Sequence, residues 1–273
     1  AIIMEHMPGA GGVIAGNHLY GPGPQDGTKI LLSHSIPLAE KLEPKGVRFE
    51  STKFQWLGTF DAIAHTMAIW HSAQVNTLDA LKTKPIIIGA FAKGHLTYQW
   101  TAMMKHVLGT NYQVITGYRS GSDLNLAMER GEVHGWAASW ENLAGTRPQW
   151  LAEKKVSVLV SFTLERKKQI PDVPTLLELA PADKKDVVEF LTAATPFGRA
   201  MAVGPGVPAD RVAALRKAFD EVMKDPAFLA EAAKRKLDID PRPAAYPQAL
   251  ADKLASASPE LVTRVKQAIG QTE

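Results

Sequence analysis

The order of apolar and polar positions predicts alternating strands and helices, and the pattern is clearest between residues 85 and 131. Two short β-branched runs, residues 86–88 and 112–115, predict strands, and a glycine stops each of them. After each loop, apolar residues recur at helical spacing, as far as Gly109 in the first case and Gly131 in the second. We therefore predict two successive strand-loop-helix units.

The two predicted loops lie where strands end and helices begin. Parallel strands need helical crossovers, and ligands of open α/β sheets bind outside the carboxyl ends of the strands. Free N–H groups at helix N-termini favour anions, so the loops outline an anion site. The same glycines would also serve as ordinary turn residues, because residues 89–94 form neither a phosphate-binding loop nor a dinucleotide fingerprint.

The remaining pattern extends this alternation along the whole chain. Further strands are predicted at residues 1–5, 28–33, 54–60, 66–70, 133–138, 156–161 and 200–203. Further helices are predicted at residues 13–19, 140–154, 184–191, 212–222, 246–254 and 260–269, and after the caps Thr77, Thr175 and Asp225. Alternation of this kind implies mostly parallel sheets, in either one sheet or two lobes.

Composition narrows the possible functions. The 273 residues, 45% of them apolar, suffice for one large domain or two lobes. Lys and Arg are dispersed and the net charge is only +3, so nucleic acid is not an expected partner. No apolar run approaches a membrane span, and the absence of cysteine excludes disulfides and thiol catalysis. His65 and His71 are poorly spaced for one metal ion, and no metal or cofactor is expected.

A hydrolase is the first alternative, because the chain contains many serines and eight histidines. No G-x-S-x-G elbow occurs, since Ser120 lies in R-S-G and Ser122 in G-S-D. We therefore predict no catalytic residues and no enzymatic activity.

Five segments, in a fixed order, carry a resemblance to a known family. They are MPGAGGVIAGNHLY with PQDGTKIL, then IIIGAFAKGHLTY, ITGYRSGSDLNLAMERGEV, RKKQIPDVPTLLEL, and VGPGVPADRVAALRKAF with MKDPAFLAEA. In these segments the chain resembles the substrate-binding proteins of tripartite tricarboxylate transporters, the TctC or Bug proteins. It departs from them in two respects. The chain begins at what looks like the family's second strand, so we expect the first strand and its glycine-rich loop to be lacking. In addition, His134 stands where Asp is expected.

The resemblance implies an α/β fold of the type II periplasmic-binding-protein class, with two lobes around a ligand cleft. Lobe one would comprise residues 1–70 and 198–273, including the helical tail, and lobe two residues 71–197. The implied function is capture of a small carboxylate in the periplasm by a monomer, which delivers it to the membrane permease subunits of the transporter. A carboxylate-sensing domain that partners a membrane sensor kinase remains the alternative, because its two lobes would have the same sequence pattern.

The resemblance also implies where the ligand binds. Its carboxylate would accept hydrogen bonds from the backbone N–H groups of Lys93, Gly94 and His95, with Arg119 and Ser120 beside it. The implied set of ligand-binding residues is Ala92, Lys93, Gly94, His95, Tyr118, Arg119 and Ser120 from lobe two, with Ser33 and His34 from lobe one. As alternatives, Lys93 and Arg119 would be solvated loop cations and His95 a helix cap.

Overall fold

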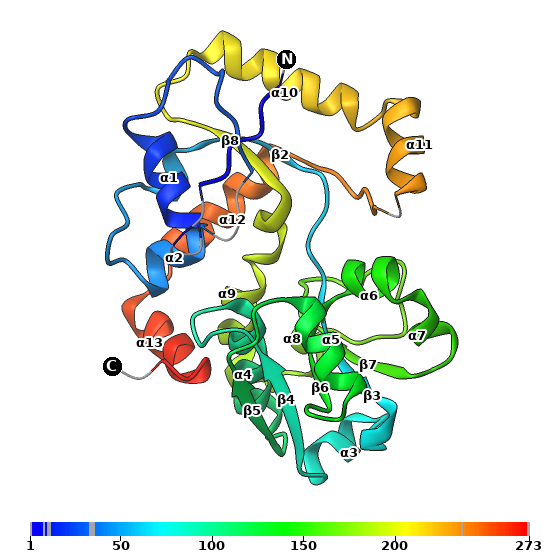
Figure 1. Ribbon diagram of the computed structural model, residues 1–273. Helices are drawn as coiled ribbons and strands as arrows, with labels where there is room; N and C mark the ends of the chain where they lie inside the picture. Colours follow the sequence, from blue (N-terminus) through cyan, green and yellow to red (C-terminus); the bar gives the residue numbers. More distant parts are fainter. Residues whose placement is uncertain (1, 8, 10–11, 33–35, 236, 272–273) are drawn as a thin grey trace. The chain divides into compact units, whose positions relative to one another are not determined.

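The computed structural model describes residues 2–7, 9, 12–32, 36–235 and 237–271. The chain divides into two compact units, which we call unit 1 (residues 1–62 and 193–258) and unit 2 (residues 63–192 and 259–273) (Figure 1). Each unit has its own sheet and helices, which confirms the predicted α/β class. The lobe boundaries at residues 70 and 197 stay a prediction.

The sheet of unit 1 has the strand order β1 (Leu31–Leu32), β8 (Ala200–Val203), β2 (Gln55–Thr59), β9 (Arg242–Pro243). All of its pairs are antiparallel. The prediction of mostly parallel sheets is therefore wrong for unit 1. The reason is that β8, which comes from a distant part of the chain, runs between two earlier strands and opposite to both.

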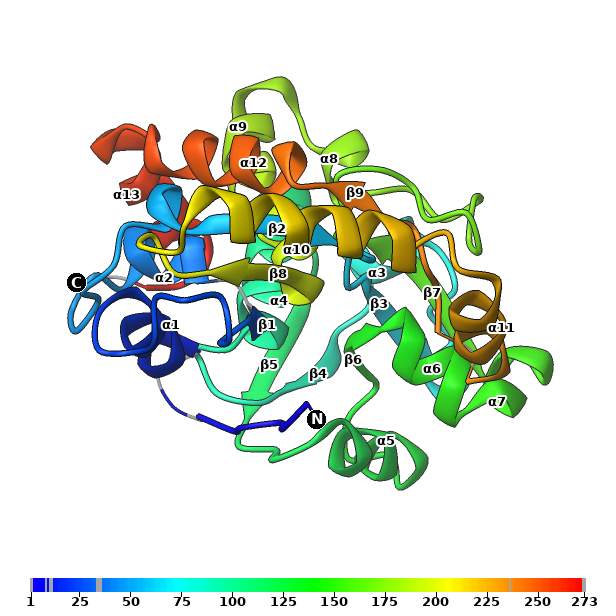
Figure 2. The same cartoon turned by 90° about the horizontal axis from the view of Figure 1, so that it is seen from above.

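Five helices of unit 1 have the bounds α1 (Val13–Tyr20), α2 (Ile36–Leu42), α10 (Ala209–Val222), α11 (Pro226–Lys234) and α12 (Ala245–Ala255). Helix α10 lies along β2 and β8 (Figure 2). Its Phe219 ring packs on Gly58, where a side chain would collide with the ring, and its Arg216 Nε donates to the Trp56 carbonyl at 2.9 Å. The Trp56 and Phe197 rings, 4.9 Å apart, form the centre of this core.

Two predicted strands of unit 1 are shorter or missing. Residues 2–5 form no strand, and Ile2, Ile3 and Met4 are 95%, 80% and 72% exposed. The strand predicted over residues 28–33 is reduced to Leu31–Leu32, paired with β8 alone. An apolar run becomes a strand only where a neighbour completes its hydrogen bonds, which the sequence pattern does not reveal.

The sheet of unit 2 has the order β5 (Tyr112–Thr116), β4 (Ile86–Ala90), β6 (Gly135–Ser139), β3 (His65–Trp70), β7 (Val156–Ser161). Strand β4 is parallel to β5 and β6, whereas β3 is antiparallel to β6 and β7. Strands β4, β5, β6 and β7 therefore run in one direction and end at the same side of the sheet, which we call the carboxyl edge.

The helices of unit 2 have the bounds α3 (Leu78–Thr83), α4 (Leu96–Leu108), α5 (Gly121–Glu129), α6 (Trp140–Thr146), α7 (Pro148–Ala152), α8 (Leu176–Leu179), α9 (Lys185–Thr192) and α13 (Pro259–Ala268). The series β4, α4, β5, α5 confirms the two predicted strand-loop-helix units. None of the helices in the described part of the chain has the length and hydropathy of a membrane-spanning segment.

The core of unit 2 is built around α4 and α5. Trp100 of α4 is fully buried and stacks on Phe162, with ring centroids 5.3 Å apart. Leu124 and Met128 of α5 pack in a second cluster with Trp136. These two clusters hold the helices, and hence the loops before them, firmly on the sheet.

His134, the departure from the family pattern, continues the pairing of β6 with β4. Its backbone N–H donates to the Ile87 carbonyl at 2.7 Å, and its ring Nδ1 accepts from the Ile87 N–H at 3.0 Å. An Asp carboxylate at this position would also be an acceptor, so the exchange keeps the hydrogen-bonding role.

One further expectation differs from the structure. The helix predicted over residues 140–154 breaks into α6 and α7 at Pro148, because proline lacks an N–H and restricts the residue before it. The resemblance implies that residues 259–268 belong to lobe one, and in the structure this segment is α13, which packs on α9 and α4 of unit 2. Its Val265 and Ala268 are buried, and Arg264 pairs with Asp186 at 2.6 Å.

Candidate functional site

Three loops of unit 2 and one direct junction of a strand with a helix lie at the carboxyl edge of its sheet. We call residues 91–95, between β4 and α4, the first loop, and residues 117–120, between β5 and α5, the second loop. Strand β6 leads directly into α6, and a long loop, residues 162–175, follows β7. Three helix N-termini thus lie at this edge, as the sequence predicts for two of them.

The first loop satisfies many of its own polar groups. The Phe91 N–H donates to Thr97 Oγ1 at 3.1 Å, and the His95 N–H donates to the Ala92 carbonyl at 2.9 Å. The His95 ring caps α4, since its Nδ1 accepts from the Thr97 N–H at 3.1 Å. Of the three N–H groups expected to meet a carboxylate, that of His95 is therefore engaged. The described residues supply no partner for the N–H groups of Lys93 and Gly94.

The second loop is tied to the first by one backbone hydrogen bond. The Gly117 N–H donates to the Phe91 carbonyl at 2.7 Å, and Gly117 has a φ of +118°, a conformation that favours glycine. Ser120 caps α5, because its Oγ accepts from the Asp123 N–H at 3.1 Å. Arg119 is exposed and makes no hydrogen bond or ion pair with the described residues. The structure therefore brings the two predicted loops together.

Tyr118 is half-buried beside these groups. Burial, aided by the negative charge of Glu132, raises the pKa of the Tyr118 phenol. The phenol therefore keeps its proton at neutral pH and is available as a hydrogen-bond donor.

The junction of β6 and α6 contributes polar groups that the sequence analysis missed. Ser139 Oγ accepts from the Asn142 N–H at 3.2 Å and so caps α6. Trp136 Nε1 donates to Asn125 Oδ1 at 3.2 Å, and Asn125 Nδ2 donates to Asn142 Oδ1 at 3.4 Å. The Ser-x-x-Asn spacing at the end of a predicted strand was the available signal for the cap.

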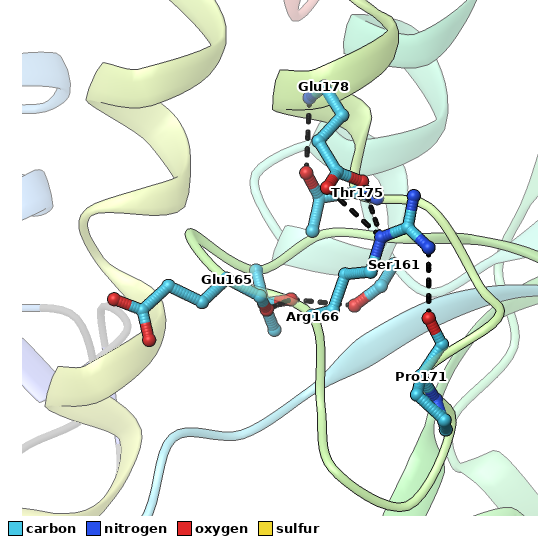
Figure 3. Close-up of polar contacts among 7 residues, drawn as sticks. Ser161, Glu165, Arg166, Pro171, Thr175 and Glu178 are labelled. Atoms are coloured by element: carbon cyan, nitrogen blue, oxygen red, sulfur yellow. Dashed lines mark hydrogen bonds and ion pairs between the residues drawn. The ribbon is translucent and has the colours of Figure 1, made fainter.

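The long loop is closed by a network at its far end (Figure 3). Arg166 Nε donates to both Glu178 oxygens, at 2.9 and 3.0 Å, and its Nη1 donates to the Pro171 carbonyl at 2.9 Å. Thr175 and Glu178 form a capping box, which confirms Thr175 as the predicted cap of α8. The hydrogen bond from the Thr175 N–H and the Arg166 guanidinium lower the pKa of Glu178. Arg166 is therefore engaged in holding the loop.

The two site residues expected from lobe one, Ser33 and His34, lie outside the described residues. Of the other expected residues, Ala92, Lys93, Gly94 and His95 lie in the first loop, and Tyr118, Arg119 and Ser120 in the second. The site that the structure describes is accordingly the part formed by unit 2.

Two α/β units, each assembled from two separate stretches of chain, define the fold of a two-lobed periplasmic binding protein. Comparison of the sequence with models of protein families and with curated protein sequences gives no match. The similarity emerges from the three-dimensional structure.

Solved structures with this fold include TctC and Bug proteins. The resemblance found in the sequence is therefore confirmed at the level of the fold. A TctC solute-binding protein from Polaromonas superimposes with a TM-score of 0.69 at 17% identity, over 97% of this chain and 85% of that one. The periplasmic binding protein BugD gives 0.65 at 19% identity, over 95% and 84%. MatC from Rhodopseudomonas palustris, with bound malate, gives 0.60 at 18% identity, over 96% and 85%.

Proposed function

We propose that the chain is an extracytoplasmic solute-binding protein that captures a small carboxylate and delivers it to the permease subunits of a tripartite tricarboxylate-type transporter. The shared fold supports this function, and one protein with that fold, MatC, holds malate. The proposed mechanism is binding and release without a chemical step.

The observation that carries the proposal is the hydrogen bond from the Gly117 N–H to the Phe91 carbonyl, 2.7 Å long. It joins the loop that carries Lys93 and Gly94 to the loop that carries Arg119. Two backbone N–H groups and a guanidinium without partners among the described residues are thus on adjacent loops. Hydrogen bonds to a charged group contribute about 1.5–3 kcal/mol each, so two or three of them support micromolar binding.

The remaining expected residues have supporting roles in this proposal. Tyr118 is a donor beside the carboxylate, while His95 and Ser120 hold the N-termini of α4 and α5 in place. Ser33 and His34 would complete the site from lobe one. Contacts to residues of both lobes would stabilise a closed form, and opening at the permease would release the ligand.

A thermal-shift titration with malate, adipate and citrate tests the proposal, with the corresponding amides as uncharged controls. A ligand that binds the folded state raises the melting temperature. At ligand concentrations above the dissociation constant, this rise grows with the logarithm of the concentration. We expect a shift with at least one carboxylate and none with its amide. Equal shifts with acid and amide, or no shift with any carboxylate at millimolar concentration, would contradict the proposed ligand class.

Arg119→Ala locates the site. Loss of one charge-assisted contact of about 1.5 kcal/mol predicts roughly tenfold weaker carboxylate binding, measured by calorimetry. Arg130→Ala is the matched control, because Arg130 is an exposed arginine of the same unit that interacts with Glu132 at 3.8 Å. Equal affinities of the two variants would remove Arg119 from the site.

A further inference from the structure

Unit 2 contains a pocket of about 470 Å³ between α4, β5 and the end of α13. Three of its lining residues are basic, namely Lys93, Lys105 and His106, and three are polar and uncharged, namely Tyr98, Thr116 and Gln267. Its volume is in the range of small-molecule sites. Among the described residues that line the pocket, none is acidic.

The local structure explains why this pocket is open and basic. Helix α4 presents Tyr98, Ala102 and Lys105 on one face, because residues three and four apart lie above one another. Strand β5 is the edge strand of its sheet, and Val114 and Thr116, two residues apart, lie on one face of it beside α4. Lys93 reaches the same pocket from the first loop.

Carbonyl groups at the two helix ends beside the pocket are already hydrogen-bonded. The Gly109 N–H donates to the Lys105 carbonyl at 3.0 Å. At the end of α13, the Gln271 N–H donates to the Lys266 carbonyl at 2.8 Å, and Gly270 has a φ of +73°. This is the arrangement of a Schellman cap, which satisfies the last carbonyls within the backbone.

The charged groups around His106 make the electrostatic potential at the pocket positive. Lys105 Nζ donates to the Tyr112 carbonyl at 2.8 Å, and this leaves two of its three N–H groups for a ligand. Lys184 Nζ donates to the His106 carbonyl at 2.8 Å, while Arg264 is paired with Asp186. Burial, Lys184 and Arg264 together lower the pKa of His106. An anion in the pocket would favour the protonated imidazole and reverse this effect.

We propose that the pocket is a second anion site, which adjoins the carboxylate site at Lys93, and that it binds a small polyvalent anion between the side chains of Lys105, His106 and Lys93. Inorganic phosphate and small di- or tricarboxylates share the required chemistry of several acceptor oxygens and more than one negative charge. Neither the fold likeness nor the proposed transport function assigns a ligand to this pocket.

Proton NMR of the His106 ring tests the proposal on the full chain. The pKa of His106 is measured in citrate, in phosphate and in sodium chloride, all at the same ionic strength. We expect citrate or phosphate to raise the pKa of His106 until the site is saturated. The salt that gives the larger rise identifies the anion that the pocket prefers. A pKa that is the same in all three salts would overturn the proposal, since screening alone then explains it.

Two variants place the anion in the pocket. Lys105→Met should weaken binding about threefold, the effect of one partly solvated charge, whereas Lys82→Met, at an exposed lysine of α3, should leave it unchanged. Gln267→Glu adds a carboxylate at an exposed lining position, leaves the Tyr112 hydrogen bond intact and should weaken binding as well. Unchanged binding in both Lys105→Met and Gln267→Glu would overturn the assignment.

Arg119→Ala separates this site from the carboxyl edge, because Arg119 does not line the pocket. The response of His106 to citrate or phosphate should be the same in this variant as in the unaltered chain. Loss of the response in Arg119→Ala would show that the anion binds at the carboxyl edge, and the second site would be rejected. The variants separate the two proposals: a thermal shift that is lost in Arg119→Ala belongs to the carboxyl edge, and one that is lost in Lys105→Met belongs to the pocket.

Discussion

The first and second loops of unit 2 occupy equivalent positions, each between a parallel strand and a helix, yet they use their polar groups differently. The first loop turns its groups inward: the Phe91 N–H bonds to Thr97 and the His95 N–H to Ala92. The second loop is held by the hydrogen bond from its Gly117 N–H to the Phe91 carbonyl of the first loop, and it leaves Arg119 exposed. In the proposed site, the first loop would contribute backbone N–H groups that its internal hydrogen bonds hold in place, whereas the second loop would contribute the Arg119 side chain.

This contrast predicts which property each loop controls. Changes beneath the first loop should lower the free energy of unfolding, since Thr97 is only 1% exposed. Replacement of the exposed Arg119 in the second loop should alter affinity while leaving stability near its original value, because surface substitutions usually change stability little. The three variants below are ordered by the loss of stability that we expect, from the largest to the smallest.

Thr97→Val should have the largest effect. The change keeps the shape of the side chain but removes the hydroxyl that accepts the Phe91 N–H. A buried donor without a partner costs about 1–3 kcal/mol, which urea unfolding would detect. Thr116→Val, at an exposed position on β5, is the control and should be close to neutral. If the two variants were equally stable, the internal bonds of the first loop would not support it.

Ser120→Ala should have an intermediate effect. Loss of an N-cap side chain destabilises by about 1 kcal/mol, and α5 would fray at the second loop. Ser120→Asp restores an acceptor for the Asp123 N–H and should recover the stability. Chemical denaturation measures the free energy of unfolding of both variants. Equal stability of the Ala and Asp variants would contradict a capping role for Ser120.

Glu178→Gln in the long loop should have the smallest effect, because the side chain is about half exposed, 46%. The pKa of Glu178 is lowered in the folded state, so its stabilisation is present above the unfolded value of 4.5 and is lost as pH falls through the folded pKa. We expect a few tenths of a kcal/mol at pH 7. Melting temperatures from pH 7 to pH 3 should converge for the two proteins. A constant difference over this range would show that the charge of Glu178 contributes nothing.

The sequence predicts those parts of the fold whose signals are local. The β4–α4–β5–α5 series follows from apolar periodicity, glycine positions and caps within about 45 residues of chain, from residue 85 to residue 131. The sheet of unit 1 depends on β8 pairing with strands far away in the sequence, and no local pattern encodes that partner. The same reason explains why the packing partners of α13 do not follow from the sequence: its amphipathic pattern shows that one face packs, without showing on which helices.

For the candidate site, the structure bears on the position of the two loops, while their role in binding stays a prediction. Parallel strands place their following loops at one edge, and this rule located residues 91–95 and 117–120 correctly at the same edge. It does not reveal what each side chain does there. The capping role of the His95 ring, the Asn125–Asn142 contact and the position of Lys93 beside α4 and α13 depend on side-chain directions that spacing leaves undetermined.

The reversed strand β3 has a consequence for biosynthesis. Its partners are β6, at residues 135–139, and β7, at residues 156–161, so β3 leaves the ribosome long before either of them exists. Its Met67 and Ile69, fully buried in the finished sheet, stay exposed to solvent for that interval. The β4–α4–β5 segment, by contrast, can assemble from neighbours in the sequence. Residues 65–70 therefore stay unpaired on the nascent chain for longer than residues 86–90, whose partner β5 follows about 25 residues later.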